Sequence, residues 1–378
     1  MISYHTFSCS VFAEVEKELD KALKTITFEP TLAICFISVK FPITDVMHLF
    51  ERQNINLFGS STSGEILFNK EKDIISEGGA VFIITDIDKN YYKLDLLNRE
   101  EDSFDFGKRV GKEVNTYFRE ASILVGGSGL TLDGQMFVEG IKEIAGENVT
   151  MYGGLAGDDA KFERTFVFTE NKISENGAVV LAFDKRHVKM NGLATSGWIG
   201  LGAELKVTRS EGNIVYEIDN QPALEVYKNY LNVSEDDLPS IGLEYPLMLK
   251  KEGMEEGPLR AVLNVDKENK TLIFAGSVPQ GSTISFSTSP GFEIMETTRQ
   301  KIIDFHEQNP QVDLLILFSC VARHMALGPL ISSEIKLASI KWNCPVIGYF
   351  TYGEIGNNIN NVCDFYNQTF TLAAISID

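Results

Sequence analysis

One turn motif occurs twice in this chain, and its repetition limits the folds that the chain can adopt. The pattern G-x-x-T-x-G-E-I runs from Gly59 to Ile66 and again from Gly348 to Ile355. A short apolar run precedes it each time, so each motif is predicted to be the turn at the end of a β-strand. The repetition indicates a fold built from copies of one α/β unit.

The predicted elements around these turns recur three times in the same order, each time over about eighty residues. The order is helix–strand–helix–strand–turn–strand. It starts with an amphipathic helix at residues 12–26 and a buried strand at 31–39. In the third copy, a strand at 312–320 is followed by a single helix predicted from Met325 to Lys341. The predicted class is α/β, or mixed α+β, with mixed β-sheets flanked by helices.

A stretch from about residue 187 to 289 separates the second copy from the third and does not follow the repeat. It contains short strands and a helix at residues 222–231, so the copies do not form a solenoid. A length of 378 residues suits two domains. The two related halves are predicted to be residues 1–190 and 191–378.

Charge and composition exclude several classes of protein. The formal net charge of -19 disfavours binding to nucleic acid or to an anionic membrane surface. No apolar run reaches the ~18 residues of a membrane span, and the N-terminus lacks the pattern of a signal peptide. The five cysteines include no C-x-x-C, which favours buried thiols in a reducing cytoplasm and no zinc site.

The two matching turns have a structural and a functional interpretation. Gly64 and Gly353 either permit an unusual backbone conformation or let a ligand approach closely. Thr62 is suited to local hydrogen bonding. The carboxylates of Glu65 and Glu354 are suited to a helix N-terminus, a ligand amine or an arginine. Turn geometry alone accounts for the glycines, so the carboxylates are the stronger candidates for ligand binding.

A looser relative of the motif, GGLAGDD, runs from Gly153 to Asp159. Gly153 and Gly154 are candidates for close contact with a ligand. Asp158 is placed where the other copies have glutamate. Two neighbouring aspartates suit a cation, but an aspartate that caps a loop is the favoured interpretation. In the third copy, aromatic residues replace the serines of the first copy, so Tyr349, Phe350 and Tyr352 are candidates to line a pocket.

The segment FSCVARH, from Phe318 to His324, follows a buried strand and opens a helix. Cys320 is a candidate nucleophile, because a helix N-terminus lowers the pKa of a thiol. No third orienting group accompanies Cys320 and His324, so a buried thiol is favoured. The guanidinium of Arg323 is suited to a carboxylate ligand, or to an internal ion pair with Glu354 or Asp158.

Together these motifs resemble the FIST family, which combines a FIST-N and a FIST-C domain. The matching segments follow one another in the expected order over nearly the whole chain. They are GSSTSGEI (59–66), YGGLAGDD (152–159), SGWIGLG (196–202), DNQPALEVY (219–227), FSCVAR (318–323) and YFTYGEIG (349–356).

The resemblance implies an intracellular, non-enzymatic sensory module. Such modules accompany histidine kinases, cyclic-di-GMP enzymes or chemoreceptors in bacteria, and amino acids or other carboxylates are proposed ligands. No kinase or cyclic-di-GMP enzyme segment is read in this chain, so a separate partner is expected to carry the output.

Some members of the family resemble haem-binding nitric oxide sensors, which makes haem an alternative cofactor. The last family motif commonly reads H-N-x-T, whereas this chain reads YNQT from Tyr366 to Thr369. A tyrosine is able to bind haem iron, but the exchange counts against haem. Three hypotheses follow: a sensor of a small polar ligand, a haem-based gas sensor, and an enzyme that uses Cys320 as its nucleophile.

Overall fold

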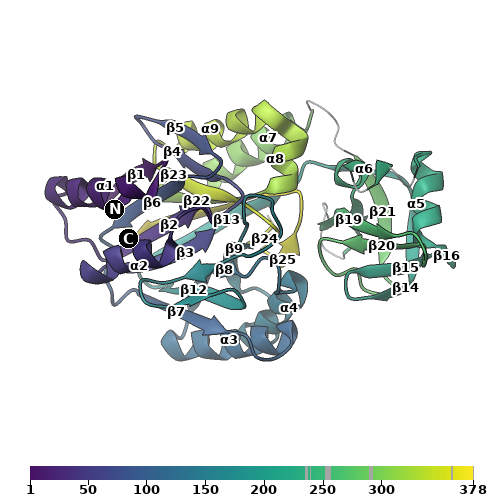
Figure 1. Cartoon of the computed structure of the whole chain (residues 1–378), viewed down its shortest axis with the longest axis horizontal. Coiled ribbons are helices and arrows are strands. Elements are labelled where there is room, and N and C mark those ends of the chain that lie inside the picture. The colour runs from purple at the N-terminus through teal and green to yellow at the C-terminus, as the bar shows by residue number, and fades with distance from the viewer. Residues whose placement is uncertain (235–236, 239, 252–256, 289–292, 359–360, 378) are drawn as a thin grey trace.

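Three copies of one β–α–β–α–β–β–β–β unit form the body of the molecule, and a smaller lobe is inserted into the third copy (Figure 1). The computed structural model describes residues 1–234, 237–238, 240–251, 257–288, 293–358 and 361–377. The mixed α/β class and the threefold repeat are confirmed. Each copy also begins with a strand that the predicted order lacked, and the first and third copies contain a further hairpin that it lacked.

The first copy shows why the apolar pattern produces these elements. Its elements are β1 (Tyr4–Cys9), α1 (Phe12–Thr25), β2 (Leu32–Ile37), α2 (Ile43–Arg52), β3 (Asn56–Ser61), β4 (Glu65–Phe68), β5 (Asp73–Ser76) and β6 (Ala80–Thr85). Helix α1 buries Val15, Leu19 and Ala22, which lie three and four residues apart on one face. Strand β2 is buried along its whole length, as expected of a strand covered on both faces.

The second copy repeats this order with a shorter hairpin. Its elements are β7 (Tyr92–Asn98), α3 (Ser103–Tyr117), β8 (Ala121–Gly127), α4 (Gly134–Ala145), β9 (Thr150–Leu155), β10 (Val167–Phe168), β11 (Ile173–Ser174) and β12 (Gly177–Asp184). The side chains of Asp102 and Asp133 cap the N-termini of α3 and α4. A loop at residues 156–166 replaces the short turn found in the other copies.

The third copy closes the chain. Its elements are β13 (Val188–Thr195), α7 (Glu293–Gln308), β22 (Leu314–Cys320), α8 (Val321–Leu327), a 3-10 turn (Gly328–Leu330), α9 (Ile331–Trp342), β23 (Val346–Thr351), β24 (Glu354–Asn357), β25 (Cys363–Tyr366) and β26 (Phe370–Ile377). The single helix predicted from Met325 to Lys341 was therefore wrong. Gly328 has a φ of 52°, and Pro329 has no N–H to continue the helix.

The lobe lies beside the body and has its own sheet and core (Figure 1). Its elements are β14 (Ile199–Glu211), β15 (Ile214–Ile218), β16 (Gln221–Pro222), α5 (Ala223–Leu231), α6 (Ser240–Glu244), β17 (Leu247–Leu249), β18 (Leu259–Arg260), β19 (Val262–Asp266), β20 (Thr271–Phe274) and β21 (Thr283–Thr288). The strands and the helix predicted between the second and third copies are confirmed.

Each sheet of the body takes four strands from one copy and a hairpin from another. The strand orders are β1-β6-β2-β3-β10-β11, β7-β12-β8-β9-β24-β25 and β13-β26-β22-β23-β4-β5. The second copy thus completes the first sheet, the third completes the second, and the first completes the third. This cyclic exchange ties the three copies together.

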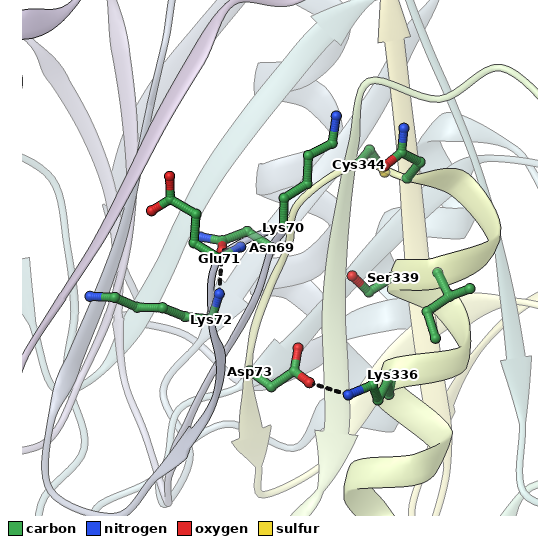
Figure 2. A pocket seen from close by; sticks show the side chains of 10 residues that line it. Asn69, Lys70, Glu71, Lys72, Asp73, Lys336, Ser339 and Cys344 are labelled. Carbon is green, nitrogen blue, oxygen red and sulfur yellow. Dashed lines mark hydrogen bonds and ion pairs between the residues drawn. The ribbon is translucent and has the colours of Figure 1, made fainter.

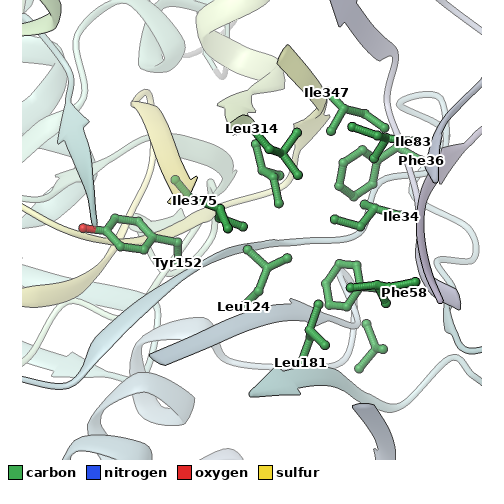
Figure 3. Packing of buried hydrophobic residues seen from close by; sticks show 14 of the residues in the cluster. Ile34, Phe36, Phe58, Ile83, Leu124, Tyr152, Leu181, Leu314, Ile347 and Ile375 are labelled. Atoms are coloured by element: carbon green, nitrogen blue, oxygen red, sulfur yellow. The ribbon is translucent and has the colours of Figure 1, made fainter. Parts of the chain in front are cut away.

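The three sheets face one central core, and the helices cover their outer faces. Figure 3 shows part of this core, where Phe36 and Phe58 of the first copy, Leu124 of the second, and Leu314 and Ile347 of the third lie close together. Separate apolar clusters fill the spaces between each sheet and its helices. The strands are therefore apolar on both faces, which explains their nearly continuous hydrophobic runs. Among the described residues, no helix is long and apolar enough to cross a membrane.

Candidate functional site

The strand-ending turns of the three copies hydrogen-bond to one another in a closed ring, which we call the turn ring. Each turn gives and receives backbone hydrogen bonds at equivalent positions. The six bonds, donor first, are Ser63 N to Phe350 O (3.0 Å), Phe350 N to Gly64 O (2.8 Å), Tyr352 N to Leu155 O (3.1 Å), Leu155 N to Gly353 O (2.8 Å), Gly157 N to Ser61 O (3.0 Å) and Ser61 N to Phe166 O (2.8 Å). The repeated motif is therefore the joint that holds the three sheets together.

The two motif glycines are required for different reasons. Gly64 has a φ of 125°, a conformation that residues with a side chain rarely adopt. At Gly353 the reason is crowding, since a Cβ atom there would lie 2.3 Å from the ring of Phe365. The structure thus accounts for both glycines without a ligand.

The motif glutamates connect the turn, through hydrogen bonds, to the start of the strand that follows the hairpin. Glu65 accepts hydrogen bonds from Thr62 Oγ1 (2.5 Å), Ser76 Oγ (2.8 Å) and the backbone N–H of Gly79 (2.9 Å). Both Glu65 and Glu354 are fully buried. Glu354 has a similar set of donors, with a thiol in addition. They are the hydroxyls of Thr351 and Thr369, the backbone N–H of Thr369 and the Cys320 thiol.

Burial raises the pKa of both carboxyl groups, although the hydrogen bonds they accept oppose the rise. The pKa of Glu65 is about 7, and that of Glu354 is also about 7. In an unfolded chain both groups titrate near their usual pKa of about 4.5. Between these values the folded protein holds protons that the unfolded chain has released. The two carboxyl groups therefore stabilise the fold below about pH 4.5 and lose that contribution as the pH rises through 7.

We expect Glu354→Gln to weaken this pH dependence. The unfolding free energy should fall less between pH 5 and pH 8 than in the unchanged protein, by up to about 3 kcal/mol. Denaturant titrations at several pH values measure the difference. Glu296→Gln is the control, because Glu296 is exposed beside Arg299. Equal pH dependence in the Glu354→Gln variant and the unchanged protein would contradict the raised pKa.

The second copy departs from the motif, and the alignment of Asp158 with the glutamates was wrong. In the strand register, Val167 pairs with Ser60 as Glu65 pairs with Tyr349, so Val167 takes the position of the glutamate. Asp158 instead accepts backbone hydrogen bonds within the inserted loop, with a further one from the Tyr352 hydroxyl. Burial alone would raise the pKa of Asp158, but these hydrogen bonds hold it below its usual range. The loop-capping interpretation is confirmed.

Arg323 is buried and engaged inside the protein. Its guanidinium donates to Glu334 Oε1 (2.5 Å) and Oε2 (3.1 Å), and to Thr298 Oγ1 (3.0 Å). It also donates to the carbonyls of Ser196 and Gln368. The internal ion pair predicted with Glu354 or Asp158 is wrong, because Glu334 of α9 is the partner. All five N–H groups are used, which leaves none for a carboxylate ligand.

A cavity of about 320 Å³ opens where the body meets the lobe, at the carboxyl ends of strands β8, β9, β22 and β23. Its lining comes from the second copy, the third copy and the lobe. The lining residues are Gly129, Leu130, Leu132, Leu155, Phe162, Ala261, Val262, Leu263, Ala275, Cys320, Val321, Ala322, Met325, Tyr352 and Asn367. A mostly apolar hollow at strand ends is typical of small-molecule sites.

The departures from the repeat build this cavity. The inserted loop carries Phe162, which stacks on Tyr352 of the aromatic turn with ring centroids 4.8 Å apart. Four of the lining residues are exposed apolar side chains. They are Leu130 (39%), Phe162 (57%), Leu263 (45%) and Met325 (61%). Exposed apolar residues gathered at one opening indicate a surface that another molecule covers.

Asn367 and Cys320 are buried polar residues of the cavity lining. Asn367 is 1% exposed, and neither its Nδ2 nor its Oδ1 has a hydrogen-bond partner. Burial and the charge of Glu354 raise the pKa of the Cys320 thiol to about 12, so this cysteine is not activated as a nucleophile.

The predicted site residues divide into two groups. Cys320 and Tyr352 line the cavity. Of the three aromatic residues predicted to line a pocket, Tyr352 does so and Tyr349 and Phe350 do not line this one. The predicted residues other than Cys320 and Tyr352 are absent from the lining and are buried in the turn ring, the central core or the Arg323 network. These are Thr62, Gly64, Glu65, Gly153, Gly154, Asp158, Arg323, Tyr349, Phe350, Gly353 and Glu354. The sequence did not predict Asn367 as a site residue, although it lies in the YNQT segment that the family motif had singled out.

The lobe is fastened to the body beside the cavity by a buried arginine. Arg260 is fully buried and donates to the side-chain oxygen of Gln135 (2.5 Å) and to the carbonyl of Phe365 (3.3 Å). Ser277 of the lobe donates to Asp133 Oδ2 (2.5 Å), and Lys251 pairs with Asp364. These contacts form the lobe joint, and Ala261 and Val262, which follow Arg260, line the cavity.

A second hollow on the body is polar, unlike the cavity beside the lobe. Figure 2 shows a polar hollow between the β4–β5 hairpin and α9, where Asp73 pairs with Lys336 and lysines and carboxylates are mixed. In the part of the chain that the structure describes, no cluster of His, Cys, Asp and Glu is suited to a metal.

The comparisons with known proteins identify the family of this chain. The FIST N domain family matches residues 31–221, and the FIST C domain family matches residues 223–357. A similar protein is the uncharacterized protein MJ1623 of Methanocaldococcus jannaschii, with 26% identity over 194 residues. That similarity covers 47% of this chain and 35% of the relative's length. FIST domains are sensory domains of signalling proteins. The chain belongs to the FIST family.

Proposed function

We propose that this chain is a non-enzymatic sensor that binds a small molecule in the cavity between body and lobe. The observation that carries the proposal is the cavity itself, with its exposed apolar opening and its lining from both parts. The sensory role of FIST domains supports it. The proposed setting is the cytoplasm, with a separate output partner such as a histidine kinase, a cyclic-di-GMP enzyme or a chemoreceptor.

A ligand in this cavity would touch both sides of the lobe joint. Leu263 and Ala275 belong to the lobe, whereas Met325 and Tyr352 belong to the body. A ligand that contacts both parts binds the docked lobe more tightly than a displaced one, and only such a difference in affinity shifts the equilibrium. The proposed signal is therefore the position or rigidity of the lobe.

The residues of the cavity do not fit haem with an axial histidine. No histidine is among its described lining residues, and Tyr366, which replaces the family histidine, is also outside the lining. Cys320 lines the cavity, but the raised pKa of its thiol disfavours the thiolate form in which a cysteine binds haem iron. The proposal therefore rests on an organic ligand. The same thiol pKa counts against a Cys320-dependent enzyme.

The test is to fill the cavity and compare what the protein binds. Ala275→Leu adds apolar volume to the lobe side of the cavity, and Ala203→Leu is the control at an exposed position of β14. Small molecules that co-purify with each protein under native conditions are identified by mass spectrometry. We expect a compound that is retained by the unchanged protein and the control but lost from Ala275→Leu. The same compounds on all three proteins would contradict the proposed site.

A further inference from the structure

We propose that the ligand of this cavity is a neutral molecule with an apolar body and one amide-like edge, which pairs with the side chain of Asn367. The inference rests on the proposed sensory function and narrows the ligand class. It also replaces the amino acids and carboxylates implied by the family resemblance, because Arg323 is not free to bind them.

The lining of the cavity selects for a neutral ligand. None of its described lining residues carries a formal charge, and most are aliphatic or aromatic. A charged group that enters such a site loses its hydration without gaining a counter-ion. Two buried carboxyl groups, Asp158 and Glu354, stand directly behind the wall, since Tyr352 donates to the first and Cys320 to the second. An anionic ligand is therefore disfavoured.

The side chain of Asn367 supplies the polar feature of the site. A buried amide without partners is costly, and nearly all buried polar side chains in proteins are hydrogen-bonded. Its Nδ2 is a donor and its Oδ1 an acceptor, so the complementary edge is a carbonyl next to an N–H. Primary carboxamides, lactams and ureides carry this edge.

The surroundings hold Asn367 in place, as expected of a recognition group. The carbonyl of Gln368 accepts from Arg323, and Thr369 is bonded through its backbone and hydroxyl to Glu354. On the other side, Tyr366 is paired with Glu354 in the β24–β25 ladder. A side chain on such a fixed backbone binds without a large loss of conformational entropy.

Three matched probes test the ligand class: benzamide, benzoate and toluene. They share one aromatic ring and differ in whether they carry an amide, a charge or neither. Binding to the full chain is measured by ligand-observed NMR in the millimolar range. We expect benzamide to bind at least about 10-fold more tightly than either of the others, which is the difference expected from one satisfied pair of buried polar atoms.

Asn367→Leu is the decisive variant, because leucine has a similar size but no polar atoms. We expect it to lose the preference for benzamide and to keep toluene binding. We also expect a higher melting temperature without ligand, because the unpartnered amide is gone; an asparagine with only a structural role would give a lower one. Asn115→Leu, at an exposed position of α3, is the control. If the leucine variant does not fold, Asn367→Ser removes the same paired edge.

The outcomes separate this inference from the proposed function. If toluene binds and Ala275→Leu abolishes its binding, but benzamide is not preferred, the ligand class is wrong and the cavity stands. A preference for benzoate would likewise show that the ligand class is wrong and leave the cavity as the binding site. If no probe binds in a way that Ala275→Leu changes, both the class and the proposed function are overturned.

Discussion

Replacing Arg323 with alanine should lower the free energy of unfolding by about 3–5 kcal/mol, the usual cost of breaking a buried ion pair from one side. The guanidinium and the Glu334 carboxylate are both almost completely buried and form a bidentate pair. Without Arg323, the carboxylate of Glu334 would remain buried without its counter-ion. The carbonyls of Ser196 and Gln368 would also lose a donor.

Urea or guanidinium titration measures this loss, and two further variants identify its cause. Arg299→Ala removes an exposed arginine that pairs with Glu296, and its effect should stay below about 1 kcal/mol. The double variant Arg323→Met with Glu334→Leu should be markedly more stable than Arg323→Ala, because no unpaired charge is left. If Arg323→Ala is as stable as the unchanged protein, the buried ion pair of Arg323 and Glu334 does not stabilise the fold.

Replacing Arg260 with alanine should release the lobe from the body, because the docked state loses about 4 kcal/mol of stability. Arg260 makes four hydrogen bonds, two of them across the joint to Gln135 and Phe365. Its loss leaves several buried acceptors without a donor, each worth about 1–3 kcal/mol. The lobe has a separate core, so it should stay folded while its contact with the body weakens.

Hydrogen exchange followed by mass spectrometry locates this effect. The expected result is faster exchange in the first turn of α4 and in β18, with little change in the central sheets. Arg209→Ala is the control within the lobe, because Arg209 forms an exposed pair with Glu217. Because the cavity is lined from both sides of the joint, Arg260→Ala should also weaken ligand binding. Slow exchange at both segments in Arg260→Ala would show that other contacts hold the lobe.

The repeat was predictable because it depends on local patterns. The amphipathic spacing of α1 and the apolar run of β2 are encoded within a few residues, and they are confirmed. The motif turns were also recognised, and the structural interpretation of their glycines holds. The sequence made Glu65 and Glu354 the stronger candidates for ligand binding. In the structure, both are buried and accept hydrogen bonds from the threonines of their own turns.

Pairings between distant segments were not predictable in the same way. Each hairpin joins the sheet of another copy, and hydrophobic periodicity says only that a strand is buried, not beside which strand. The partner of Arg323 was missed for a similar reason. Glu334 lies on α9, in a segment predicted as part of one continuous helix, and Gly328 and Pro329 turn the chain before it.

By itself, the sequence determined the α/β class, the three copies and the turns that join their strands, because these follow from the spacing of residues along the chain. The family followed from the resemblance of its motif segments to the FIST family. Only the tertiary structure decided which residues face a ligand. The cavity is lined by a loop of the second copy, a turn of the third and strands of the lobe, which are distant in the sequence and lie together in the tertiary structure. Burial also separated structural residues from candidate ligand-binding residues. Glu65, Glu354 and Arg323 are buried in internal contacts, whereas the buried amide of Asn367, in the cavity lining, has no hydrogen-bond partner.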